Sequence, residues 1–190
     1  MKSRFIVPLA LVASLSLLGL VGCQAAAPAS VSSQTSVGSG STASGVLPVD
    51  SNPINNTSTA PGLSIVAAAV EDNVDPVTKA ALGDRLQVTL KNSTTKDLSA
   101  VEIYYLMTDV TTGQTEGYYQ SLSGLTLPAG AETTIFFDNE TGPGHFPENV
   151  FSLYRSSVNQ VDFAIEVSAD GVQLARATAS KGAGTGEKVD

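Results

Sequence analysis

The sequence contains no tryptophan and only one histidine, His145, among its 190 residues. A cluster of histidine metal ligands and a two-histidine acid–base pair are therefore excluded. Neither a Gly-x-Ser-x-Gly nucleophile motif nor a glycine-rich phosphate-binding loop occurs, and the many serines nominate no partner for His145 in a catalytic triad. We therefore predict that the protein is not an enzyme, with a small hydrolase that uses His145 as an alternative.

Basic residues are also few. The chain has 10 lysines and arginines against 18 acidic residues, and its formal net charge at pH 7 is -8. A chain with this charge is repelled by phosphate backbones and by anionic lipid headgroups. Nucleic acid is therefore not an expected partner.

The single cysteine, Cys23, stands at the end of an apolar segment. Lys2 and Arg4 give the segment a positive start, residues 5–20 are apolar apart from two serines, and small residues follow. This order is typical of a secretory signal peptide, which we predict at residues 1–22. The apolar run is short for a membrane-spanning helix and lacks charges on its downstream side. With one cysteine, no disulfide can form within the chain, so the core must supply the stability.

The residues "LVGC" that end at Cys23 resemble the lipobox of bacterial lipoproteins. In that family a diacylglycerol is attached to the cysteine through a thioether, and the signal peptide is cut just before it. The resemblance implies a covalent diacylglycerol and an N-acyl lipid on Cys23, and acyl chains in this number anchor a protein stably. We therefore expect a bacterial cell-envelope protein, anchored in the membrane by lipid, with its domain outside the cytoplasm. An ordinary signal peptide with an incidental cysteine is the alternative.

The next segment, residues 23–62, is rich in Ser, Ala, Thr, Gly and Pro, and Asp50 is its only charged residue. Such a segment buries too little apolar surface to offset the entropy lost on ordering. We expect a flexible linker here, a folded domain at residues 63–181 and a disordered tail at residues 182–190. About 120 residues are enough for one domain with its own core.

Beyond residue 62 the apolar residues recur with a period of two. In the segment 85–92, Leu86, Val88 and Leu90 share one face, which is the pattern of a half-buried strand. Strands are expected at 63–70, 85–92, 101–108, 115–122, 132–138, 161–168 and 172–180. Seven short antiparallel strands around one core predict an all-β fold, an immunoglobulin-like antiparallel β-sandwich of about seven strands.

Within this domain the strand "VTLKN" ends in an Asn-containing turn, "VEIYYLMT" carries aromatic residues, and the turn "LPAG" precedes "ETTIFF". In this order, residues 85–138 resemble the small β-sandwich modules of exported bacterial proteins known as FxLYD-like or related immunoglobulin-like domains. The resemblance implies the same fold and an exported location. Such modules have mostly accessory or unknown roles, so no functional residue is carried over.

Three pairs of adjacent aromatic residues lie in the predicted strands. Because strand side chains alternate between faces, one ring of each pair should point outward. We predict that Tyr104, Tyr119 and Phe136 form one exposed aromatic face, a feature typical of contact surfaces. The alternative is that the linker or neighbouring loops cover these rings.

The connection at residues 141–160 is too apolar for a solvated loop. We expect a helical turn that begins at Pro147, where a missing N–H costs nothing. Phe151, together with Leu153 or Tyr154, should close one end of the sandwich.

A functional alternative for the same connection makes His145, Tyr154 and Arg155 the rim of a ligand site, because binding residues concentrate on loops held by a rigid scaffold.

Two acidic loops, "EDNVDP" at 71–76 and "DNETG" at 138–142, offer oxygen ligands of the kind that Ca²⁺ prefers. Neither has the glycine and distal glutamate of a calcium loop, and Asn and Asp also initiate turns without a metal. No metal and no cofactor other than the lipid on Cys23 is therefore expected. Two function classes remain: a module that binds an envelope protein or a glycan, and a structural or accessory lipoprotein of an envelope assembly.

Overall fold

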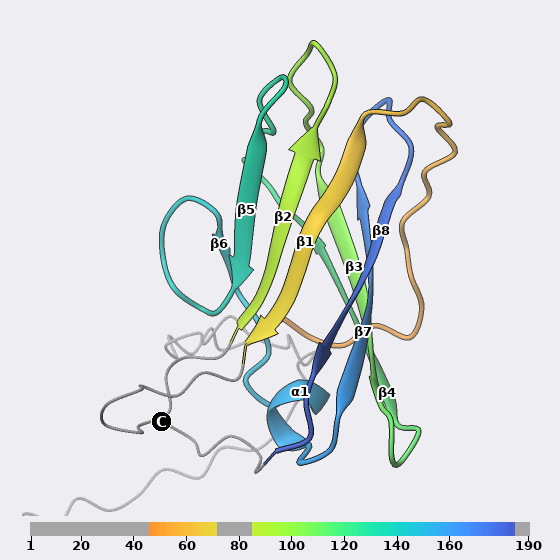
Figure 1. The fold of residues 1–190 in the computed structure, drawn as a ribbon, viewed down its shortest axis with the longest axis vertical. Helices are drawn as coiled ribbons and strands as arrows, with labels where there is room; N and C mark the ends of the chain where they lie inside the picture. Colours follow the sequence, from red (N-terminus) through yellow and green to blue (C-terminus); the bar gives the residue numbers. More distant parts are fainter. Residues whose placement is uncertain (1–45, 72–84, 185–190) are drawn as a thin grey trace, which may run out of the picture. The chain divides into compact units, whose positions relative to one another are not determined.

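The computed structural model describes residues 46–71 and 85–184, which form a β-sandwich (Figure 1). One sheet has the strand order β1-β2-β5-β6 and the other β4-β3-β7-β8. The elements are β1 (Leu63–Glu71), β2 (Arg85–Asn92), β3 (Glu102–Asp109), β4 (Thr115–Ser121), β5 (Glu132–Phe137), β6 (His145–Phe146), α1 (Leu153–Ser156), β7 (Val161–Ser168) and β8 (Ala175–Lys181).

All seven predicted strands are present, and the strand order is that of an immunoglobulin-like fold. β1-β2-β5 corresponds to strands A-B-E, and β4-β3-β7-β8 corresponds to C′-C-F-G. The additional strand, β6, is two residues long and pairs with β5 in parallel, whereas the other strand pairs are antiparallel. The prediction of an antiparallel β-sandwich is confirmed.

The core lies between the two sheets and is formed by the inward residue of each alternating pair. At its centre the ring of Tyr105 lies 5.5 Å from that of Tyr118, 5.7 Å from Phe137 and 6.2 Å from Phe163. These rings come from β3, β4, β5 and β7, so both sheets contribute. The period-two pattern thus identifies the buried faces of β2, β3 and β7 correctly.

Residues 46–62 belong to the predicted linker, but the structure packs them against the sheet β4-β3-β7-β8. The Val49 N–H donates a hydrogen bond of 2.8 Å to the Gly117 carbonyl on β4. The Asn52 side-chain amide donates one of 2.6 Å to the Glu166 carboxylate on β7. Because β3 lies between β4 and β7, the segment crosses the outer face of this sheet. The prediction of a flexible linker is therefore wrong for this part, and residues 23–45 lie outside the described residues.

A second asparagine fastens the same segment further along the chain. The Asn56 side-chain amide donates hydrogen bonds of 3.0 Å to the Ser168 hydroxyl and to the Val172 carbonyl. Ser168 and Glu166 are two residues apart on β7, so both side chains point to the outer face of the sheet. Ser168 is nevertheless only 6% exposed, because the segment with Asn56 covers it. The segment is thus held largely by hydrogen bonds of its asparagine side chains and its backbone, with few apolar residues, which is why composition indicated disorder.

The helix α1 begins later than expected, and only part of the predicted apolar set closes the end of the sandwich. A turn at Asn149 precedes the helix, because its side-chain oxygen accepts the Phe151 N–H at 2.9 Å. This turn leaves Phe151 84% exposed, whereas Leu153 and Tyr154 are 4% and 3% exposed. The predictions of a helix from Pro147 and of a buried Phe151 are wrong, whereas the prediction that Leu153 or Tyr154 closes this end of the sandwich is correct for both residues.

Asp109, at the end of β3, connects this end of the sandwich to the residues after α1. Its buried carboxylate accepts hydrogen bonds from the Ser157 hydroxyl (2.6 Å), the Asn159 amide (2.9 Å) and the N–H groups of Thr111 (2.9 Å) and Thr112 (2.8 Å). These donors, Ser157 foremost, hold the pKa of Asp109 well below its usual value.

The lowered pKa predicts how stability depends on pH. The stabilisation by the Asp109 carboxylate should be complete above its ordinary pKa of 3.8 and should fall as the pH drops below that value towards the native pKa. We expect Asp109→Asn to lower the urea midpoint of unfolding at pH 7, and the gap from wild type to shrink below pH 3.8. Asp170 is exposed, so Asp170→Asn is the control. It should leave the urea midpoint unchanged both at pH 7 and below pH 3.8. An equal gap at every pH would contradict the assignment.

Candidate functional site

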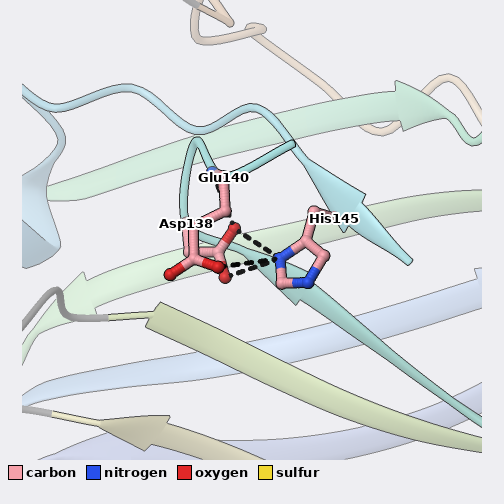
Figure 2. A group of neighbouring side chains, drawn as sticks. All are labelled: Asp138, Glu140 and His145. Carbon is pink, nitrogen blue, oxygen red and sulfur yellow. Dashed lines mark hydrogen bonds and ion pairs between the residues drawn. The ribbon is translucent and has the colours of Figure 1, made fainter. Parts of the chain in front are cut away.

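His145 and two carboxylates form a compact cluster where β5 ends and β6 begins (Figure 2). The imidazole Nδ1 lies 3.1 and 3.0 Å from the two carboxylate oxygens of Asp138 and 3.8 Å from Oε2 of Glu140. The imidazole ring also stacks on Phe136 of β5, with the ring centroids 5.1 Å apart. The cluster is therefore fixed to the sheet through the aromatic ring and the hydrogen bonds to Asp138.

The loop between the two strands has the backbone that this arrangement needs. Asn139 has a φ of 61° in the left-handed region, and the Glu140 N–H donates to Oδ1 of Asp138 at 3.0 Å. Gly144, with a φ of 85°, lies where an added Cβ would come 3.1 Å from the Thr134 carbonyl. A glycine is thus required for the chain to return close beside β5 and to place His145 next to Asp138.

The three side chains differ in exposure. The Asp138 side chain is 4% exposed, that of His145 is 20% exposed and that of Glu140 is 65% exposed. Among the described residues, the side-chain hydrogen bonds of His145 go to Asp138, so a serine–imidazole contact of the kind found in a catalytic triad is not formed there.

An open groove of about 680 Å³ lies beside the cluster. It is lined by residues 123–126 with Pro128, by Thr133 and Thr134 of β5, and by residues 142–146. The lining combines the hydroxyl groups of its serine and threonines and the imidazole of His145 with apolar side chains, among them Leu125 and Phe146. The groove therefore offers both hydrogen-bonding groups and apolar contacts to a ligand.

The structure does not assemble the predicted rim of His145, Tyr154 and Arg155. Tyr154 is buried in the core, where its ring meets Phe163 edge-on with 5.8 Å between centroids. Arg155 forms a largely buried ion pair with Glu148. Only His145 is at a surface groove, so this prediction is wrong for the other two residues, whose apolar and ionic partners draw them into the end of the sandwich.

A buried polar network surrounds that ion pair and was not foreseen from the sequence. The Tyr118 hydroxyl donates to Glu116 and accepts a hydrogen bond of 2.9 Å from the Asn149 amide. Burial, and then the neighbouring Glu116, raises the pKa of Tyr118. Burial, with Glu148 next in importance, also raises the pKa of Tyr105. Isolated polar residues in a strand or loop carry no sequence signal for such a network.

The predicted aromatic face is divided between the two sheets. Tyr104 and Tyr119 are register partners on β3 and β4, whereas Phe136 lies on β5 of the other sheet and stacks on His145. The prediction of one shared face is therefore wrong. Tyr104 and Tyr119 are half-buried, and the crossing of residues 46–62 over the same sheet supports the alternative in which the linker covers the rings.

No protein-family model matches the chain, and no curated protein matches it in sequence. Among solved structures it is similar to Spo0M, a sporulation control protein from Bacillus subtilis, with a TM-score of 0.34 and 12% sequence identity. The match covers 65% of this chain and 50% of that chain, so this protein spans half the length of Spo0M. A likeness of this size supports no function, and the fold rests on the strand order and the core.

In the part of the chain that the structure describes, no helix has the length and apolar character needed to cross a membrane.

Proposed function

We propose that this protein is a bacterial lipoprotein, anchored in a membrane of the cell envelope by lipid on Cys23, and that its β-sandwich is a non-enzymatic binding module. The observation that carries the proposal is the sequence "LVGC", which follows the basic residues Lys2 and Arg4 and an apolar segment. The thiolate of Cys23 is the chemically suitable acceptor for the lipid. The partner is an envelope protein or a glycan.

The groove beside His145 is the surface that best suits such a partner. It is an open groove that combines hydrogen-bonding groups with apolar side chains and lies beside the loop 138–145, and binding residues concentrate on loops that a rigid scaffold holds. Its threonine hydroxyls and the imidazole can exchange hydrogen bonds with a glycan or with the backbone of a protein segment.

A structural or accessory role in an envelope assembly is the second candidate. It is favoured by the docking of residues 46–62, which leaves residues 24–45 as the connection between Cys23 and the sandwich. Affinity purification of the acylated protein from solubilised membranes distinguishes the two roles. A stable complex of fixed stoichiometry supports the accessory role, whereas capture of a soluble ligand supports the binding role.

Replacement of the anchor residue tests the proposal. We expect the wild-type protein to partition into the detergent phase of Triton X-114, and Cys23→Ser to move to the aqueous phase or to remain an unprocessed precursor. His145→Ala is the matched control and should partition as the wild type does. A mature Cys23→Ser protein in the detergent phase would show that lipid on this cysteine is not the anchor.

A further inference from the structure

We propose that Asp138, Glu140 and His145 form a binding site for a divalent transition-metal cation, with Zn²⁺ as the cation that tests it. The cluster supplies one imidazole nitrogen and two carboxylate oxygens, and these donor atoms all lie within 4.8 Å of one another. Imidazole together with carboxylate is a donor set that suits Zn²⁺ and its first-row neighbours, whereas Ca²⁺ and Mg²⁺ take oxygen ligands.

The spacing of the donor atoms fits a metal coordination shell. Ligand atoms at about 2.0–2.2 Å from Zn²⁺ lie about 3.0–3.5 Å from one another. Nδ1 of His145 is already 3.0 Å from Oδ2 of Asp138, and it is 3.8 Å from Oε2 of Glu140. Because the Glu140 side chain is 65% exposed, it is free to make the small rotation that brings its oxygen to the same distance.

The charges of the cluster point independently to a cation. Asp138 is a carboxylate with a side chain only 4% exposed, and burying a carboxylate is costly unless a positive charge compensates it. Within the described residues, no lysine or arginine forms an ion pair with Asp138 or Glu140, and their ion-pair partner is His145. Two carboxylates and one imidazole leave an excess of negative charge, which a dication would balance.

The ligands are also held in place by residues around them. The stack on Phe136 fixes the plane of the His145 ring, and the Asn139 side chain accepts the Glu148 N–H at 2.9 Å, which fixes the loop between the ligands. Outer contacts of this kind orient metal ligands and raise affinity. Three protein ligands leave coordination positions for water on the exposed side of Glu140.

Isothermal titration of the full chain with Zn²⁺ tests the proposal. The chain should carry Cys23→Ser, because the thiol of Cys23 is itself a zinc ligand. We expect one Zn²⁺ to bind per chain and to raise the melting temperature. His145→Ala and Glu140→Gln should each weaken binding by at least about tenfold, and the exposed Glu140 can be changed without disturbing the core.

Glu132→Gln is the matched control, because Glu132 is an exposed carboxylate on the same strand, β5, and lies outside the cluster. The Glu132→Gln variant should bind Zn²⁺ with the same affinity as the chain that has Glu132. The proposal is overturned if Zn²⁺ shows no saturable binding or if His145→Ala and Glu140→Gln, folded by circular dichroism, bind as tightly as the control. Binding of Ca²⁺ as tight as that of Zn²⁺ would overturn the role of the imidazole nitrogen.

Discussion

Leu153→Ala should lower the free energy of unfolding by about 2–5 kcal/mol, the usual cost of removing a buried leucine side chain. Leu153 is 4% exposed and, with Tyr154, closes the end of the sandwich between the sheets. Urea unfolding followed by circular dichroism measures the change. A loss of this size is a large part of the stability of an ordinary domain.

Phe151→Ala is the matched comparison, two residues away in the same connection. Phe151 is 84% exposed, so its truncation should change the free energy of unfolding by less than about 0.5 kcal/mol. If Phe151→Ala were the more destabilising of the two, the end of the sandwich would be closed by Phe151 and the placement of α1 would be wrong.

Arg155→Met should destabilise the domain by about 3–5 kcal/mol, because it removes the guanidinium that forms an ion pair with the buried Glu148 carboxylate. The two side chains are 12% and 6% exposed, so solvent cannot replace the lost interaction. Methionine keeps much of the length of the arginine side chain, which limits the loss of packing. The free energy of unfolding in urea is again the measurement.

The double variant Arg155→Met/Glu148→Gln separates the charge from the packing. Removing both charges should recover much of the lost stability, because the buried Glu148 carboxylate is then replaced by a neutral amide. A double variant as unstable as Arg155→Met alone would mean that the ion pair does not account for the loss.

The strands and the core could be predicted from the sequence because one physical regularity governs them. Alternation of apolar and polar residues marks the buried face of β2, β3 and β7, and the structure buries those residues. The assignment of strands to sheets is not contained in this pattern. Phe136 and Tyr104 both point outward, but only the topology shows that they lie on different sheets.

The docking of residues 46–62 could not be predicted from composition, because it depends on hydrogen bonds from single asparagines and from the backbone. Asn52 and Asn56 bind partners more than a hundred positions further along the chain, Glu166 and Ser168. Single asparagines in a segment rich in serine and proline look the same whether or not such partners exist. The sequence therefore supports only the weaker statement that this segment contributes little to the apolar core.

From the sequence, the residues of the candidate site are assigned to two different loops. Asp138 and Glu140 appeared as one acidic loop, and His145 as part of another loop with Tyr154 and Arg155. The return of the chain through Gly142 and Gly144, both with positive φ, brings the imidazole back to the carboxylates. The sequence "TGPG" between them is the signal that could have suggested a tight reversal at this point.

The central claim, that Cys23 carries the membrane anchor, is tested most directly by mass spectrometry of the N-terminal peptide. The protein should be produced in a bacterium that processes lipoproteins and extracted from its membranes. The account predicts a peptide that begins at Cys23 and carries the added mass of a thioether-linked diacylglycerol. A peptide in which Cys23 has a free thiol, or a mature N-terminus at any other residue, would contradict it.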